Sequence, residues 1–150
     1  MDQHEKARQA REGAELNRRR DLQEVASKGL MATEDTCVTV VPYFKIHSGN
    51  EQAMRELCER FVARTTNEPK CLYYGFSFDG DAMHCREGYQ DGEGALAHLA
   101  NVDALLREAL TLADLTRLEI HGVESELAAL RAPLASFNPQ YFVLEYGFRR

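Results

Sequence analysis

Residues 71–102 read CLYYGFSFDGDAMHCREGYQDGEGALAHLANV, and this stretch decides the fold. Its first part alternates large apolar side chains with smaller or polar ones, and the large ones are Leu72, Tyr74, Phe76 and Phe78. Alternation with a period of two is typical of a strand with one buried face, and the Asp79-Gly80 pair that follows is a strong signal for a tight turn. The stretch therefore predicts a β-hairpin.

The strand that returns from this turn divides its side chains between two faces, because successive residues of a strand point to opposite sides. His84 and Arg86 share one face, and the other face holds Met83, Cys85, Glu87 and Tyr89. Asp91 then offers an N-cap for a helix whose apolar stripe consists of Ala95, Leu99, Val102, Leu106 and Leu110. His98 falls at the margin of that stripe.

The flanking sequence extends this unit into an α+β domain. A first strand at 37–46 contains Pro42, which predicts an edge position or a bulge because proline cannot donate a ladder hydrogen bond. A helix follows, with a capping box formed by Ser48 and Glu51, and it ends before Pro69. The remaining elements are a strand at 116–122, a short helix at 124–130 and a last strand at 141–148.

The order β-α-β-β-α-β, with one strand added, predicts the split βαβ arrangement of a ferredoxin-like sandwich with an antiparallel sheet. Two helices cover one face of such a sheet. The first strand also places Val41 and Tyr43 on the alternation opposite to Val38, Val40 and Phe44, so its second face carries apolar side chains too. A homodimer that stacks two sheets would bury this face, and we expect a homodimer.

Composition excludes several classes of partner. The 18 Lys and Arg against 24 Asp and Glu give a net charge of −6, which repels phosphate backbones, so we expect no nucleic-acid partner. No apolar run approaches the roughly 18 residues of a membrane span, and the N-terminus lacks an apolar signal-peptide core. These features predict a cytoplasmic protein without a membrane partner. The four cysteines and five histidines show no recognised ligand spacing, so we expect no metal site.

The chain divides into a charged extension, residues 1–36, and a folded domain, residues 37–150. The stretch from Asp2 to Ala26 is crowded with charge and has too few large aliphatic side chains for a core of its own. It contains good helix formers and no proline. We therefore expect a solvated helix or a flexible extension.

Two sequence pieces carry a resemblance to a known family. REGYQD, residues 86–91, followed by a helix with His98, resembles the antibiotic biosynthesis monooxygenase-like family, which shows Glu, an aromatic residue, Asp and then a helical His. LEIHGVESELAALRAPLASFNPQYFVLEYGF, residues 118–148, is similar to a subset of this family. The resemblance covers about residues 37–148. It implies a dimeric α+β barrel with a pocket between sheet and helices in each subunit.

The resemblance also implies a range of activities. Some members of such families oxidise quinols or polyphenols without metal or flavin, others bind and degrade haem, and others have no known reaction. Oxygenation without a cofactor needs a base, a dry pocket and donors for the resulting anion. For haem, His98 could serve as an axial ligand, but the chain has no tryptophan and so departs from the haem-degrading members.

Five residues are candidates for the site. His98 is the candidate catalytic base, and its alternative role is a structural hydrogen bond to a neighbouring strand. Tyr74 is a candidate pocket wall and hydrogen-bond donor to a substrate oxygen, with core packing as its alternative. Arg86 could stabilise an anion in the pocket or pair with an acid such as Glu119 across the sheet.

The other two candidates follow from their position relative to the motif. Glu87 matches the recurrent acid of the family, and its alternative is a structural role in the hairpin or at a dimer contact. Asn101 lies one turn after His98 on the same helix flank, and its alternative is a solvent-exposed helix position.

Three functions from different classes follow. The first is a monooxygenase or oxidoreductase that acts without a cofactor on a small aromatic or quinol-type substrate, with His98 as its base. The second is a non-catalytic domain that binds a small hydrophobic molecule in the same pocket. The third is a dimeric interaction domain whose charged N-terminal helix recruits a partner.

Overall fold

The computed structural model describes residues 2–27 and 33–150. The chain forms two compact units, and the boundary between them in the sequence lies between Thr33 and Glu34. The first unit contains helix α1, Gln3–Ser27, which carries intrahelical ion pairs of Arg8 with Glu5 and of Arg19 with Glu15. Among the helices of the described residues, none has the length and apolar character needed to cross a membrane.

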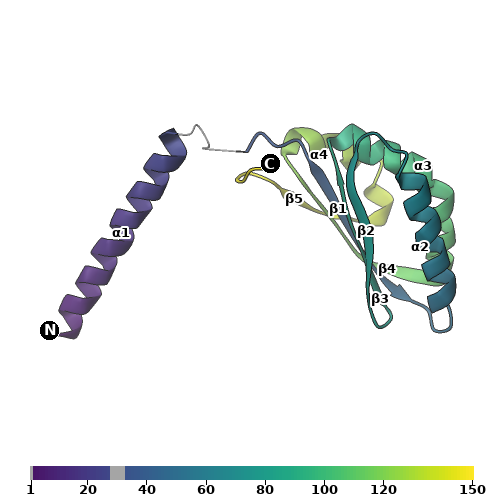
Figure 1. Ribbon diagram of the computed structural model, residues 1–150, viewed down its shortest axis with the longest axis horizontal. Helices are drawn as coiled ribbons and strands as arrows, with labels where there is room; N and C mark the ends of the chain where they lie inside the picture. The colour runs from purple at the N-terminus through teal and green to yellow at the C-terminus, as the bar shows by residue number, and fades with distance from the viewer. Residues whose placement is uncertain (1, 28–32) are drawn as a thin grey trace. The chain divides into compact units, whose positions relative to one another are not determined.

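The second unit is an α+β domain (Figure 1). Its elements are β1 Val38–Ile46, α2 Glu51–Thr65, β2 Cys71–Asp79, β3 Ala82–Tyr89, α3 Gly92–Leu112, β4 Ala113–Gly122, α4 Glu124–Arg131, the 3₁₀ helix η1 Ala135–Phe137 and β5 Gln140–Val143. The strands lie in the order β2-β3-β1-β4-β5. The pairs β2–β3, β3–β1 and β1–β4 are antiparallel. The predicted ferredoxin-like α+β fold is confirmed.

The sheet is mixed, whereas the sequence predicted an antiparallel one. Strand β5 pairs with β4 in parallel, with Glu119 opposite Gln140 and Gly122 opposite Val143. The physical reason is the connection: α4 and η1 carry the chain back along the sheet before β5 begins, as a crossover between parallel strands must do. The strand is also shorter than predicted, and ends at Val143.

Pro42 lies in the middle of the sheet, so the predicted edge position is wrong and the alternative, a bulge, is confirmed. The register of β1 with β4 shifts between Tyr43 and Phe44. On the β3 side, the paired residues pass from Val40 opposite Glu87 to Tyr43 opposite His84. Pro42 is paired with Leu118 of β4, next to this shift, and lies in a gap of the β3 ladder, where its missing N–H is tolerated.

The two predicted helix caps behave differently. Asp91 caps α3 as expected, since its carboxylate accepts a hydrogen bond from the backbone N–H of Gly94 at 2.8 Å. The capping box of Ser48 and Glu51 does not form, because the N-cap of α2 is Asn50 and its side chain makes no cap hydrogen bond. The Asn50 amide instead donates to the carbonyl oxygen of Leu112 at 3.5 Å.

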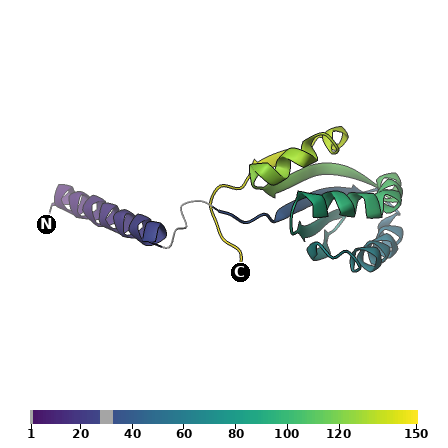
Figure 2. The ribbon, with the colours of Figure 1, turned by 90° about the horizontal axis from the view of Figure 1, so that it is seen from above.

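Helices α2, α3 and α4 pack on one face of the sheet (Figures 1 and 2). One core cluster lies under α2 and the second half of α3, and includes Phe44, Met54, Phe61, Met83 and Val102. A second cluster lies under α4 and the first half of α3, and includes Val38, Tyr89, Ile120, Leu127 and Leu130. Helix α3 contributes to both clusters, so the region where they meet lies beneath this helix.

The opposite face of the sheet, which we call the outer face, carries Tyr43, Tyr73, His84 and Arg86. The Tyr43 and His84 rings meet edge to face at 4.7 Å between centroids, and the Arg86 guanidinium lies 5.1 Å from the centre of the Tyr73 ring. The Tyr73 ring also crosses Gly88, where an added Cβ would lie only 2.3 Å from it. Glycine at this position therefore leaves the space that the Tyr73 ring occupies.

Candidate functional site

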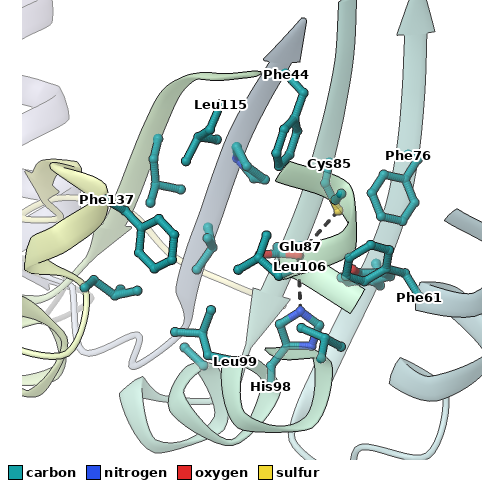
Figure 3. Close-up of a pocket in the computed structure, with 18 of the residues that line it drawn as sticks. Phe44, Phe61, Phe76, Cys85, Glu87, His98, Leu99, Leu106, Leu115 and Phe137 are labelled. Carbon is teal, nitrogen blue, oxygen red and sulfur yellow. Dashed lines mark hydrogen bonds and ion pairs between the residues drawn. The ribbon is translucent and has the colours of Figure 1, made fainter. Parts of the chain in front are cut away.

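A pocket lies between the sheet and the helices, and α3 forms one of its walls (Figure 3). Its enclosed space measures about 70 Å³. Apolar side chains make up most of the wall, among them Phe44, Phe61, Phe76, Leu99, Val102, Leu106, Leu115, Leu118 and Phe137. Five of these, Phe76, Leu99, Leu106, Leu115 and Phe137, are only partly buried.

The polar groups of the wall come from the hairpin and from α3. Strand β2 contributes Tyr74, strand β3 contributes Cys85, Glu87 and Tyr89, and α3 contributes His98. The three β3 residues share the inner face because they stand at every second position. The pocket is therefore dry along most of its length and has one polar corner.

His98 connects this corner to a second carboxylate. Its Nδ1 lies 2.9 and 3.0 Å from the two carboxylate oxygens of Glu68, and its Nε2 lies 3.7 Å from Oε2 of Glu87. The exposed fractions of the three side chains are 5 % for His98, 11 % for Glu68 and 7 % for Glu87. Tyr74 and Tyr89 hold the imidazole between them, with ring centroids at 5.1 and 5.2 Å.

Glu68 is held from the other side by α3. The Asn101 amide donates to Oε2 of Glu68 at 2.8 Å and to the carbonyl oxygen of Arg64 at 3.3 Å. Because an ionised carboxylate only accepts hydrogen bonds, the contact with Glu68 requires that Nδ1 of His98 carries the hydrogen. In neutral His98 the lone pair is then on Nε2, which faces Glu87 and the pocket.

The ionisation of the corner follows from its burial. Burial raises the pKa of Glu87 to about 8, the nearby Glu68 charge adds to this rise, and the Cys85 thiol and the Tyr89 hydroxyl oppose it. Burial lowers the pKa of His98, and the Glu68 carboxylate opposes that shift. At neutral pH the corner therefore contains a protonated Glu87 beside a neutral imidazole whose Nε2 can accept a proton.

The other polar groups of the corner stay protonated. Burial raises the pKa values of Tyr74, Cys85 and Tyr89, and the Glu87 carboxyl raises all three further. The Cys85 thiol donates to Oε2 of Glu87 at 3.4 Å. These three groups can donate hydrogen bonds to a ligand, but they are poor bases and poor nucleophiles.

Comparisons with known proteins place this domain. The structure of MupZ from Pseudomonas fluorescens superposes with a TM-score of 0.73 and 46 % sequence identity, covering 76 % of this chain and 94 % of that chain. An antibiotic biosynthesis monooxygenase superposes with a TM-score of 0.50 and 18 % identity, over 55 % of this chain and 92 % of that one. The chain is therefore a relative of MupZ, and its domain has the fold of antibiotic biosynthesis monooxygenases.

The other comparisons either show a similar fold without close sequence similarity or find no match. A conserved protein of unknown function from Bacteroides thetaiotaomicron shares 19 % identity with a TM-score of 0.53, over 57 % of this chain and 96 % of that one. No protein-family model and no curated protein matches the sequence. The likeness therefore rests on the solved structures, and the domain has a monooxygenase-type fold.

In this domain, the predicted site residues take three kinds of position. Tyr74, Glu87 and His98 meet in the pocket. Asn101 lies behind them and contacts Glu68. Arg86 lies on the outer face against Tyr73, away from the pocket, and makes this cation–π contact instead of an ion pair with Glu119.

Sequence reasoning missed Glu68 and Tyr89 as members of the site. Glu68 belongs to the segment between α2 and β2, 30 residues before His98, and no local motif marks it. Tyr89 did carry a signal, since it shares the strand alternation of Glu87. The sequence indicates only the strand face on which Tyr89 lies, because no motif gives its hydroxyl group a partner or a function.

The residues present do not fit haem. The space of about 70 Å³ is less than half of a cavity that takes up benzene, whereas a haem macrocycle is several times larger than benzene. For metal ions, the described part of the chain contains no group of three or more His, Cys, Asp or Glu side chains that could hold one.

Proposed function

We propose that this chain is an enzyme that transfers protons on a small, largely apolar substrate bound in the pocket, without metal or flavin. The observation that supports this most directly is the row Glu68, His98 and Glu87 at the polar corner of an otherwise apolar pocket. A buried base oriented by a carboxylate, beside a neutral carboxylic acid, is the arrangement that acid–base catalysis requires.

His98 is the base in this proposal. Nε2 takes the proton of the substrate, and the imidazolium that forms is stabilised by the Glu68 carboxylate on Nδ1, in the way that a buried acid supports histidine in hydrolase triads. Glu68 also prevents the ring from turning and fixes the hydrogen on Nδ1. Asn101, which donates to Glu68, is a positioning residue.

The reaction that the monooxygenase-type fold and the sequence resemblance suggest is oxygenation of a quinol-type or phenolic substrate whose keto form carries a CH2 group. Loss of a proton to His98 leaves an electron-rich anion, which gives one electron to dioxygen. The substrate radical and superoxide then join to form a peroxide, which loses water to leave a carbonyl group. One oxygen atom enters the substrate, the other leaves as water, and the substrate supplies all four electrons, so no external reductant is needed.

The size of the pocket limits how such a substrate can bind. The enclosed space of about 70 Å³ is less than half of the roughly 150 Å³ of an apolar cavity that takes up benzene. An aromatic ring therefore enters fully only when the partly exposed side chains at the mouth, such as Leu106 and Phe137, move aside. Narrow substrates fit without this movement.

A second reaction class is favoured by one observation, the protonated state of Glu87. A neutral carboxylic acid in a dry pocket can protonate an oxygen atom of a substrate, and His98 can accept a proton in the same step. Such a reaction is an isomerisation or a hydrolysis, and it consumes no oxygen. The site then acts as an acid–base pair without a redox step.

The decisive experiment compares the wild type with His98→Gln, which keeps a donor for Glu68 but removes the base. His84→Gln is the matched control, because His84 lies on the outer face of the sheet. Thermal stabilisation is measured with quinols, naphthols, flavonoids, simple phenols and short unbranched ketones. Oxygen consumption and product mass are recorded for each compound that stabilises the protein.

The outcomes separate the candidate functions. Oxygen uptake that is lost in His98→Gln and kept in His84→Gln supports oxygenation. A product formed without oxygen uptake, with the same dependence on His98, supports the second reaction class. Ligand binding with no product in the wild type contradicts both and leaves the domain as a binding module.

The proposal includes a cytoplasmic homodimer that joins two outer sheet faces. Aromatic side chains on this face, Tyr43 and Tyr73, support it, because within residues 34–150 no helix covers them. Light scattering at micromolar concentration tests the assembly, and a monomeric mass would remove it.

A further inference from the structure

We infer that Tyr89 and Glu87 form an oxyanion hole made of two neutral O–H donors, which binds the substrate oxygen atom that becomes negative when His98 removes a proton. The ligands that this corner would take are phenols, enols and ketones that can form an enolate. The inference rests on the proposed function and names its substrate class.

The first observation is the Tyr89 hydroxyl. Tyr89 has an exposed fraction of 0 %, and its hydroxyl oxygen forms no hydrogen bond of normal geometry with any described residue, although it lies close enough to Glu87 to lower the pKa of that carboxyl. Buried polar side-chain atoms nearly always have a partner, because an unpaired one loses its hydrogen bonds to water without replacement. An unpaired hydroxyl in the wall of a pocket is thus a donor available to a ligand.

The second observation is the position of Glu87 relative to Tyr89. The two residues stand two positions apart on β3, so both side chains lie on the inner face and both line the pocket. The Cys85 thiol donates to Oε2 of Glu87, which leaves Oε1 to carry the acid hydrogen. The 3.7 Å separation between Oε2 and Nε2 of His98 is too long for a hydrogen bond, so the acid hydrogen is not committed to His98.

The third observation is the charge of the wall. Among the described residues that line the pocket there is no Lys and no Arg, so nothing attracts an anion from solution. A negative oxygen formed inside the pocket is different, because the proton it loses stays on His98 and the pair remains neutral overall. Two O–H donors with raised pKa values supply hydrogen bonds without adding a positive charge, and such donors are effective in an apolar site.

An oxyanion hole at this position requires that both donors are protonated. A second ionised carboxylate at Glu87 would repel the negative oxygen and would compete for the His98 proton. The same burial that keeps Glu87 neutral removes water that would otherwise solvate the anion. Base and donors lie together at one corner of the pocket, since Nε2 of His98 is 3.7 Å from Oε2 of Glu87 and the His98 and Tyr89 ring centroids are 5.2 Å apart.

The test uses 4-nitrophenol, whose ionised form is yellow, and nitrobenzene, which has the same ring and nitro group but no hydroxyl. Binding of both is measured on the wild type, on Tyr89→Phe, and on Tyr73→Phe as a matched control on the outer face. The visible spectrum of bound 4-nitrophenol is recorded below the pH at which it ionises in water.

We expect the wild type to bind 4-nitrophenol more tightly than nitrobenzene and to hold part of it in the yellow form. Tyr89→Phe should weaken 4-nitrophenol binding by about tenfold or more, the usual loss for a hydrogen bond to a charged acceptor, and change nitrobenzene binding by less than about twofold. Tyr73→Phe should change neither. Glu87→Gln, which keeps a donor, should weaken 4-nitrophenol binding less than Tyr89→Phe does.

Several results would overturn the inference. The first is a wild type that binds the two probes equally tightly or binds neither. The second is an equal loss of affinity for both probes in Tyr89→Phe, which would show that Tyr89 has a packing role. A clear fall in the melting temperature of Tyr89→Phe would also overturn it, because an unpaired hydroxyl contributes nothing to folding. The probe experiment measures binding and not turnover, so the two proposals can fail separately. Probe binding that does not depend on Tyr89, together with His98-dependent oxygen uptake, rejects the hole and keeps the proposed function. Probe binding that depends on Tyr89, in a protein without His98-dependent turnover, supports the hole and rejects the proposed function.

Discussion

The two faces of the β2–β3 hairpin are made by the same two strands, yet they have opposite chemistry. The inner face presents Tyr74, Glu87 and Tyr89 to a dry pocket, where burial raises all three pKa values. The outer face presents Tyr73 and Arg86, which meet in a cation–π contact. A shift of one residue along a strand separates the two, so the face decides the behaviour of a side chain more than its type does.

The two histidines next to these faces allow the strongest test of the contrast. His98→Ala removes one of the two side-chain donors of Glu68 and leaves this buried carboxylate with its hydrogen bond from Asn101, so it should lower the free energy of unfolding by about 3 kcal/mol. His84→Ala on the outer face should cost less than about 1 kcal/mol. Urea unfolding of the three proteins measures both, and equal losses would mean that the site is not distinct from the surface.

The pH dependence of stability tests the inner face alone. The folded pKa of Glu87 is about 8, above its ordinary value of 4.5, so the unfolded chain releases this proton first and stability falls as pH rises toward 8. His98 has a lowered pKa and so acts in the opposite direction, but only below its ordinary value of 6.5. Between pH 6.5 and 8, the wild type should lose about 2 kcal/mol relative to Glu87→Gln.

Urea unfolding of both proteins at several pH values in this window measures the difference. A constant difference between wild type and Glu87→Gln would show that Glu87 is ionised in the folded protein at neutral pH. That result would remove the acid from the proposed site while leaving His98 as a base.

Two glycines of the hairpin, Gly88 and Gly75, differ in the space available for an added side chain. Gly88→Ala would bring a Cβ within 2.3 Å of the Tyr73 ring, which must swing away, and we expect a loss of about 1–2 kcal/mol. Gly75→Ala meets nothing within 4 Å and should be nearly neutral. Thermal unfolding measures both. Adding Tyr73→Ala to Gly88→Ala should restore most of the lost stability, and a failure to do so would contradict the steric explanation.

The smallest expected effect concerns two tyrosine hydroxyls. Tyr73→Phe loses the 3.1 Å hydrogen bond with Thr39 and should cost about 1 kcal/mol at most, whereas Tyr89→Phe loses no hydrogen bond and should match or exceed the stability of the wild type. Melting temperatures by circular dichroism distinguish them. The reverse order would show that the inner hydroxyl is the one with a structural role.

Much of this fold was predictable because its signals are local. The alternation from Leu72 to Phe78, the Asp-Gly turn and the Asp91 cap each involve neighbours in sequence, and each appears in the structure. The path of β5 and the central place of β1 were not predictable in the same way. Both depend on which strands pair across the sheet, and a proline in β1 is compatible with an edge or with a bulge until its neighbours are known.

The sequence by itself determined which side chains share a strand or helix face: Glu87 with Tyr89, and His98 at the margin of the α3 stripe. Periodicity of the backbone is enough for this, because it acts over a few residues. Only the tertiary structure decided that Glu68 meets Nδ1 of His98, that Arg86 points away from the pocket, and that Glu87 holds its proton. These properties depend on burial and on contacts between distant segments, which arise only when the sheet and helices close around the corner.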